Sequence, residues 1–290
     1  MADGTAVIVK HVTPDGLAAR MGGRIDLLHT LWTSGVFHRV PDVVDHATLA
    51  VEKAGDGWIV VMRDVSDAVL ADDYVLTRDE NRRVLRAADA LHRAFWGERV
   101  EALPTLAEYY AIFLRLHTAG SEFSIAKLIA RGWELFPEVA PPDVASVMSA
   151  LIADPGLISA ELEKHPSTLI HGDLRLHNIG LTSDRVVLLD WEITACAPPA
   201  VEFAWYLIIS ATRIDETREE IIDDFRLVSG DHFDPRALEI ALVGALACLG
   251  WNKALDIVEH PDPGIRAQER ADLDWWIARV RTALETWSPV

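Results

Sequence analysis

The stretch that decides the fold is HGDLRLHN, residues 171–178, followed twelve residues later by DWE, residues 190–192. An apolar run leads into each block, TLI at 168–170 and VVLL at 186–189. An apolar, β-prone run that ends in polar residues is typical of a strand that delivers side chains to a loop. The sequence therefore predicts two strands whose ends bring two Asp carboxylates and one Asn carboxamide together.

This set of side chains suits phosphoryl transfer. One carboxylate orients or accepts the proton of an attacking hydroxyl, while an Asn and a second Asp hold the metal ions that neutralise the phosphates. The order His-x-Asp-x-x-x-x-Asn, with a later Asp after a strand, is also the order of kinase catalytic loops. A purely structural alternative is a buried strand pair whose polar ends cap turns, and the two blocks in register favour the catalytic interpretation.

The two blocks resemble the aminoglycoside phosphotransferase and choline kinase family, which has His-Gly-Asp in the loop and Asp-Phe/Trp-Asp/Glu at the metal site. The resemblance implies that Asp173 is the catalytic base and that His171 supports the loop. It also implies that Asn178 and Asp190 are the ligands of Mg²⁺ and that ATP is the phosphoryl donor.

The same resemblance implies an α+β, bilobal, protein-kinase-like fold. Residues 1–64 would form a small, β-rich nucleotide-binding lobe, and residues 65–290 a large, mainly helical lobe with the catalytic loop and the acceptor site. Within the small lobe we expect a strand at 5–12, a helix at 17–32 and a hairpin. The hairpin strands are 48–51 and 58–62, with the Asp-Gly pair at 56–57 as the turn signal.

Lys10 ends the run VIVK, which is similar to the kinase strand whose lysine pairs with the nucleotide α- and β-phosphates. In the family a helix carboxylate about sixteen residues further on orients this lysine. Asp26 stands at that offset in place of the usual Glu, so we expect a looser or water-bridged ion pair. An exposed surface lysine is the alternative interpretation for Lys10 taken alone.

The residues after the last predicted small-lobe strand would form the hinge that holds adenine. By position, the Arg63 carbonyl and the Val65 amide are the expected adenine partners, and Met62 is expected to line the pocket. A plain connection from strand to helix would look the same, because any residue type can supply main-chain hydrogen bonds.

The phosphate-covering loop of kinase-like folds has no counterpart in this sequence. Only nine residues precede Lys10, and neither GxGxxG nor GxxxxGK[ST] occurs. We therefore expect a small lobe truncated before the lysine strand, or a sequence that starts inside a longer protein. A non-catalytic pseudokinase or nucleotide-binding protein stays open as the second function. A protein kinase is disfavoured, because Asp-Phe-Gly and Ala-Pro-Glu are absent.

Helical spacing of apolar residues dominates the rest of the chain. Within it, His92 is expected to be a packed core histidine, and Glu202 takes the place of the family's Asp that braces the catalytic loop. The predicted helices cover residues 77–95, 106–117, 125–135, 143–162, 218–228, 235–257 and 265–286.

Composition limits the possible partners. The 45 acidic and 27 basic residues give a net charge of −18, which disfavours nucleic acid and anionic membranes and suits a cationic acceptor. The two Cys residues form no CxxC pair, so a disulfide framework or zinc site has no support. No signal peptide is recognisable, and the apolar stretch 237–251 is best interpreted as a buried helix, so the expected location is cytoplasmic.

The sequence thus predicts a kinase that uses ATP and Mg²⁺ to phosphorylate a hydroxyl group of a small molecule. The family implies an aminoglycoside-like antibiotic, a sugar or an amino-alcohol as the acceptor. Pocket walls vary freely on a shared fold, so the acceptor and the oligomeric state stay open.

Overall fold

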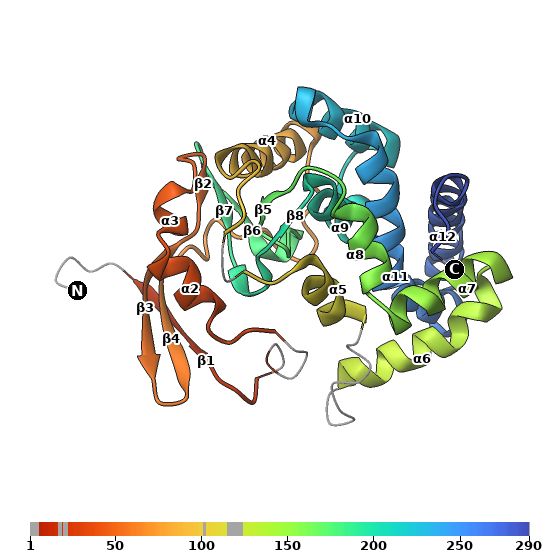
Figure 1. Cartoon of the computed structure of the whole chain (residues 1–290), viewed down its shortest axis with the longest axis horizontal. Helices are drawn as coiled ribbons and strands as arrows, with labels where there is room; N and C mark the ends of the chain where they lie inside the picture. The colour runs from red at the N-terminus through yellow and green to blue at the C-terminus, as the bar shows by residue number, and fades with distance from the viewer. Residues whose placement is uncertain (1–5, 17–18, 20–22, 101–102, 115–123, 290) are drawn as a thin grey trace. The chain divides into compact units, whose positions relative to one another are not determined.

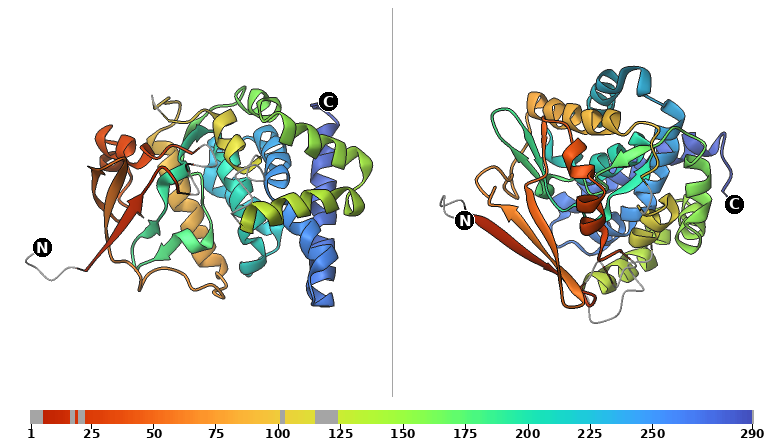
Figure 2. Two further views of the ribbon diagram at one scale, coloured as in Figure 1. Left: turned by 90° about the horizontal axis from the view of Figure 1, so that it is seen from below. Right: turned by 60° about the vertical axis from the view of Figure 1, so that its left-hand side comes forward.

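The computed structural model describes residues 6–16, 19, 23–100, 103–114 and 124–289. The chain forms two compact units, one of Met1–Thr105 with Pro166–Phe233 and one of Leu106–His165 with Asp234–Val290. The described strands all belong to the first unit, and the described residues of the second form helices (Figures 1 and 2). The predicted α+β class is confirmed. The predicted lobe boundary at residues 64 and 65 stays a prediction.

An antiparallel sheet with the strand order β1-β4-β3 carries Lys10. Its strands are β1 (Val7–Val12), β3 (Thr48–Ala54) and β4 (Gly57–Arg63). The predicted hairpin is confirmed, but its turn lies one residue earlier than expected, because Ala54 pairs with Gly57. Gly55 takes the positive φ of 59° that this turn requires, a conformation that costs glycine little. The glycine at 57 instead allows close packing, since a Cβ there would lie 2.2 Å from a carbonyl oxygen of β1.

Two short helices, α2 (Leu27–Thr33) and α3 (Val36–Arg39), follow β1 along the chain. They are separated by Gly35, whose φ is 77°. Residues 17–18 and 20–22 of the predicted helix 17–32 lie outside the described residues, so only its second half can be compared. That half is helical and buries three leucines, in agreement with the predicted apolar face: Leu27, Leu28 and Leu31.

Two small sheets support the predicted catalytic residues. In one, β5 (Thr168–Ile170) pairs antiparallel with β8 (Ala195–Ala197). In the other, β7 (Val186–Leu188) lies between β6 (Ile179–Leu181) and the parallel strand β2 (Val44–Asp45). The two predicted strands therefore exist, but they belong to different sheets. The 3₁₀ turns η2 (Leu176–Asn178) and η3 (Trp191–Ile193) follow β5 and β7. Asn178 lies in η2, Asp190 directly precedes η3, and Asp173 lies between β5 and η2.

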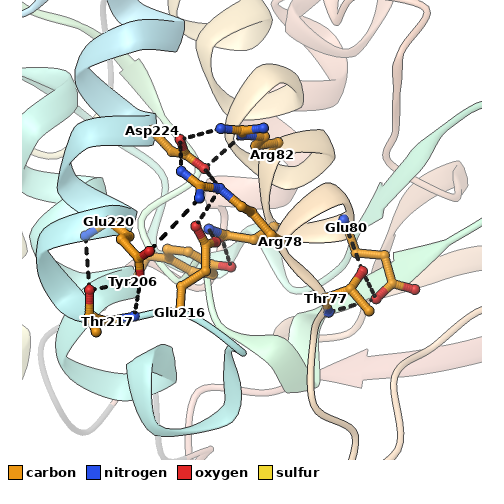
Figure 3. Close-up of polar contacts among 10 residues, drawn as sticks. Thr77, Arg78, Glu80, Arg82, Tyr206, Glu216, Thr217, Glu220 and Asp224 are labelled. Atoms are coloured by element: carbon orange, nitrogen blue, oxygen red, sulfur yellow. Dashed lines mark hydrogen bonds and ion pairs between the residues drawn. The ribbon is translucent and has the colours of Figure 1, made fainter.

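The first unit also contains α4 (Arg78–Ala94), α9 (Pro199–Ser210) and α10 (Arg218–Ser229), with the short turns η4 (Ala211–Arg213) and η5 (Gly230–His232). Capping boxes begin both α4 and α10. Thr77 and Thr217 each accept a hydrogen bond from the backbone of a Glu three residues on, whose carboxylate accepts from the Thr backbone in return (Figure 3). Such reciprocal bonds satisfy amides that the first helical turn leaves without partners.

The second unit consists of helices in its described residues: α5 (Leu106–Leu114), α6 (Ser124–Val139), α7 (Pro142–Ala153), α8 (Gly156–Leu162), α11 (Pro235–Glu259) and α12 (Pro263–Leu284). The last part of the predicted helix 106–117 lies outside the described residues. The single helix predicted at 143–162 is wrong, since α7 and α8 meet at a bend of 94°. Pro155 causes the break, because a proline disfavours helical backbone in the residue before it, here Asp154 with ψ 94°.

Helix α11 forms the core of the second unit and packs mainly on α6 and α12. It is long and apolar enough to cross a membrane by length and composition, but 72% of its most apolar stretch is buried. Its one deeply buried cation, Lys253, pairs with Glu269 of α12 at 3.2 Å and also with Asp272. The predicted buried helix is thus confirmed.

Candidate active site

Asp173 lies in the loop after β5, and its side chain is 12% exposed and contacted by nitrogen groups of the protein. The side-chain amide of Asn178 donates to Asp173 Oδ2 at 2.9 Å and to the Asp173 carbonyl at 3.0 Å. The indole N–H of Trp205, from α9, donates to Oδ1 at 3.0 Å. Arg175 Nε lies 3.2 Å from Oδ2. Both carboxylate oxygens are therefore held in place by residues of the protein itself.

The electrostatic surroundings of Asp173 favour a role as a base. Burial raises the pKa of Asp173, the Arg175 guanidinium opposes this rise, and the negative charge of Asp190 adds to it. A carboxylate with a raised pKa binds a proton more readily, which favours general-base catalysis. Asn178 bonds to Asp173, and its carbonyl accepts from the amide of Leu189, the neighbour of Asp190, so the two predicted carboxylates lie near each other.

His171 is fully buried beneath the same loop. Its Nδ1 accepts a hydrogen bond from the Asp173 amide at 3.3 Å, and its ring meets that of Trp191 edge to face at 4.6 Å. Burial lowers the pKa of His171, so the ring is neutral with its proton on Nε2. These contacts place His171 where a residue that supports the loop would lie.

Glu202, in the first turn of α9, connects the catalytic loop to α4. Its Oε1 accepts a hydrogen bond from the Gly172 amide at 2.8 Å, and its Oε2 lies 2.7 Å from His92 Nε2. Burial acts to raise the pKa of Glu202, but the hydrogen bond from His92 and the His92 charge hold it below its ordinary value. The predicted brace by Glu202 is confirmed. His92 is buried as predicted, although its bond to this brace was not anticipated.

Lys10 of β1 reaches two carboxylates near the end of β7. Its Nζ lies 2.8 Å from Asp190 Oδ1 and 2.7 Å from Glu192 Oε1. Asp190 takes a left-handed conformation, with φ 67° and ψ 61°, which is uncommon outside glycine. Burial acts to lower the pKa of Lys10, but the attraction of the two carboxylates outweighs it and the pKa is raised. Lys10 is thus a charged residue of this site rather than an isolated surface lysine.

Lys10 and Asp26, which were predicted to pair loosely or through water, each contact other side chains, and their pairing stays a prediction. The guanidinium of Arg24 binds Asp26 through two bonds, Nε to Oδ1 at 3.0 Å and a terminal nitrogen to Oδ2 at 2.8 Å. A guanidinium two residues away matches both carboxylate oxygens at once, which a single ammonium group cannot do. The partner of Lys10 that the sequence failed to indicate is Glu192.

The predicted hinge residues lie at and after the end of β4. Met62 is half-buried in the sheet, and the Arg63 amide donates to the Ala47 carbonyl at 2.9 Å. The Arg63 guanidinium binds the buried Asp45 carboxylate. The Val65 carbonyl accepts a hydrogen bond from the amide three residues on. The roles of Met62, Arg63 and Val65 toward adenine stay predictions, and the contact with Asp45 was not anticipated.

The oxygen donors near Asp190 suit Mg²⁺ bound together with phosphates. The β6–β7 pairing brings Asn178 beside Asp190, since the Leu189 amide donates to the Asn178 carbonyl at 2.9 Å. The Asn178 side-chain oxygen is not used in the two bonds that its nitrogen makes to Asp173. In the described part of the chain, no group of three or more His, Cys, Asp or Glu side chains is arranged to hold a metal. Mg²⁺ often binds one or two carboxylates and takes its other ligands from substrate phosphates and water, and these donors fit that pattern.

Helix α9 is also bonded to α4. The Tyr206 hydroxyl donates to Asn81 Oδ1 at 2.9 Å, and Asn81 Nδ2 donates to Glu216 at 2.7 Å. Because Tyr206 follows Trp205 directly, these bonds connect the part of α9 that contacts Asp173 to α4.

A buried carboxylate, Asp224, fastens α10 to α4 beside these bonds. Its side chain is 3% exposed, and it accepts hydrogen bonds from Arg82 at 2.7 Å and from Arg78 at 3.1 Å (Figure 3). The hydrogen bond from Arg82 is the largest of the causes that lower the pKa of Asp224 to about 2. Helix α4, which carries His92, is therefore joined to α10 by charged contacts that the sequence did not indicate.

Comparisons with known proteins identify the family of the chain. A sequence model described as the phosphotransferase enzyme family matches residues 2–240 of the chain. No curated protein is similar enough in sequence to count as a match.

Solved structures show the same fold. The aminoglycoside phosphotransferase APH(3'')-Id from Streptomyces rimosus, in complex with ADP and streptomycin, is 18% identical, with 85% of this chain and 88% of that chain covered and a TM-score of 0.53. Choline kinase LicA from Streptococcus pneumoniae is 13% identical, with 95% and 87% covered and a TM-score of 0.56. A microcompartment-associated aminopropanol kinase is 14% identical, with 98% and 87% covered and a TM-score of 0.57. These similarities confirm a protein-kinase-like α+β fold with small N-terminal sheets.

Proposed function

The chain belongs to the phosphotransferase enzyme family, and we propose that it transfers the γ-phosphoryl group of ATP to a hydroxyl group of a small molecule. The observation that carries this proposal is the set of contacts around Asp173. A buried carboxylate held by Asn178, Trp205 and Arg175 lies near a second carboxylate that pairs with a lysine. A loose phosphoryl-transfer transition state asks the protein mainly for such positioning and charge.

Asp173 acts as the base in this mechanism. Its two oxygens offer about four acceptor positions, and the hydrogen bonds from Asn178 and Trp205 take one each. A further position accepts the hydrogen bond from the acceptor hydroxyl. Asp173 takes the hydroxyl proton as the new bond to phosphorus forms, and ADP leaves.

Lys10, Asn178 and Asp190 serve the nucleotide. Lys10 binds the α- and β-phosphates, and the oxygens of Asn178 and Asp190 hold Mg²⁺. When bound, Mg²⁺ neutralises phosphate charge and orients the γ-phosphoryl group. The main-chain groups of Arg63 and Val65 bind adenine, with Met62 against the ring.

A cationic acceptor agrees best with the charge of −18. Streptomycin, choline and aminopropanol, which the names of the similar structures specify, are all alcohols that contain nitrogen. We propose an aminoglycoside-like antibiotic, a sugar or an amino-alcohol as the acceptor, and neither nucleic acid nor a membrane as a partner. We propose a cytoplasmic location, where ATP is available.

A non-catalytic pseudokinase is the second candidate, because the sequence contains no glycine-rich run to cover the phosphates. A screen for ADP release over hydroxylated small molecules, with and without Mg²⁺, separates the two functions. An enzyme releases ADP in the presence of one acceptor class, gives a phosphoester detectable by ³¹P NMR, and loses both signals in Asp173→Asn. A pseudokinase gains thermal stability from ATP and Mg²⁺, but no acceptor raises its ADP release above that of the variant.

A further inference from the structure

Two carboxylates from one short segment hold Lys10. Asp190 and Glu192 lie at the start and in the middle of the η3 turn region, 2.8 and 2.7 Å from the lysine nitrogen. Asp26, which a conventional helix position would offer, is bound by Arg24 instead. Lys10 is therefore oriented by residues 190–192, which we call the metal segment because it contains the proposed metal ligand Asp190, rather than by a residue next to α2.

The two carboxylates differ in their surroundings. The Glu192 side chain is 18% exposed, whereas that of Asp190 is 36% exposed. Ion pairs that are shielded from water are screened less than exposed ones. Of the two contacts, the one with Glu192 is thus the better shielded.

Packing fixes the position of Glu192. Its neighbour Trp191 is 1% exposed and donates its indole N–H to the Leu188 carbonyl at 2.7 Å. The same ring meets His171 at 4.6 Å and Phe37 at 5.5 Å, both edge to face. Because these contacts hold the Trp191 ring, the backbone at Trp191 is fixed, and the adjacent Glu192 is held in one position.

Asp190 pairs with Lys10 and is also the proposed ligand of Mg²⁺. These two roles compete, because a carboxylate oxygen that binds the metal cannot pair equally well with the lysine. Glu192 has no such conflict in the proposed mechanism. We infer that Glu192 is the positioning residue that orients Lys10 toward the nucleotide phosphates while Asp190 turns to the metal. This inference rests on the proposed function, and it assigns to the metal segment the task that a helix carboxylate would otherwise perform.

The test compares Glu192→Gln, which removes the charge at constant size, with Asp26→Asn as the matched control. We expect Glu192→Gln to weaken ATP–Mg²⁺ binding, measured by calorimetry, about tenfold, and Asp26→Asn to bind like wild type. Glu192→Asp, which keeps the charge, should regain part of the lost affinity. Equal affinities of Glu192→Gln and wild type, or an equal loss in Asp26→Asn, would overturn the inference.

Two further readouts do not depend on catalysis. In the absence of nucleotide, reductive methylation of Lys10, followed by mass spectrometry, should be faster in Glu192→Gln than in wild type and unchanged in Asp26→Asn. Equal rates in all three proteins would contradict the pairing even if the protein bound no ATP at all. Mn²⁺ affinity at saturating ADP, measured by electron paramagnetic resonance, should be unchanged in Glu192→Gln. A loss of Mn²⁺ affinity would instead make Glu192 a metal ligand and overturn the inference.

Discussion

The two carboxylates of the site differ in how completely the protein holds them. The Asp173 side chain is 12% exposed and is contacted by an amide, an indole and a guanidinium of its own unit. The Asp190 side chain is 36% exposed and pairs with Lys10, itself a proposed nucleotide ligand. We infer that the proposed base, Asp173, is held in position before any ligand binds. Asp190, in contrast, would gain its remaining partners only when the nucleotide and its metal bind.

The largest expected effect comes from removing the prepositioned base. Asp173→Asn should lower kcat by about 10²–10⁴-fold, because proton transfer by a positioned side chain contributes about that much. ATP affinity should change little, since Asp173 is not a nucleotide ligand in this account. Steady-state kinetics and calorimetry measure the two quantities. A variant with near-native kcat would remove Asp173 from the mechanism.

The second-largest expected effect concerns the contact between His92 and Glu202, which supports the catalytic loop. His92→Ala leaves Oε2 of the buried Glu202 carboxylate without its hydrogen bond, and a buried polar group left unsatisfied in this way costs about 1–3 kcal/mol of unfolding free energy. Urea denaturation measures this loss. The control is Arg226→Ala, which breaks an exposed pair with Asp223 and should cost less than about 1 kcal/mol. Similar costs in both variants would mean that His92 does not support the loop.

The third effect concerns the contacts of Asp224 and depends on pH. The native pKa of Asp224, about 2, is below its unfolded value, so the carboxylate stabilises the fold above roughly pH 4 by about 2 kcal/mol. That stability is lost as the pH falls from about 4 through about 2. The difference in unfolding free energy between wild type and Asp224→Asn should therefore be full at pH 7 and shrink at pH 3. A difference that does not change with pH would contradict the assigned pKa.

The smallest expected effect concerns the hydrogen bond that Trp205 donates to Asp173. Trp205→Phe keeps the buried ring but removes a donor to the carboxylate, so the pKa of Asp173 should rise further. The base must be deprotonated to act, and the acidic limb of the kcat/KM profile should therefore move to higher pH. kcat should fall by less than the full effect of Asp173→Asn. An unshifted limb would mean that Trp205 does not influence the base.

Local patterns in the sequence predicted much of this architecture. The catalytic loop, the strand before each block and the helix that begins after Thr77 depend on neighbours within a few residues, which a sequence displays directly. The brace by Glu202 was also predictable, because the resemblance supplied its position. The broken helix at Pro155 was an avoidable error, since the proline itself signals the break.

Contacts between distant segments could not be predicted in the same way. Lys10 and Asp190 are separated by 180 positions, and no local pattern indicates that Glu192 joins them. The role expected of Asp26 came from a helix offset carried over from the family, which took no account of its bonds to Arg24, two residues away. The donor from Trp205 to Asp173 likewise depends on how α9 packs against the loop, which spacing alone does not show.

One measurement tests the central claim most directly: a crystal structure of the protein with Mg²⁺ and a non-hydrolysable ATP analogue. We predict that Asp173 keeps its bonds to Asn178 and Trp205. We also predict that Lys10 leaves Asp190 and binds the phosphates, and that Asp190 binds Mg²⁺. A structure in which Lys10 stays on Asp190, or in which the Asp173 contacts form only with the nucleotide present, would contradict these predictions.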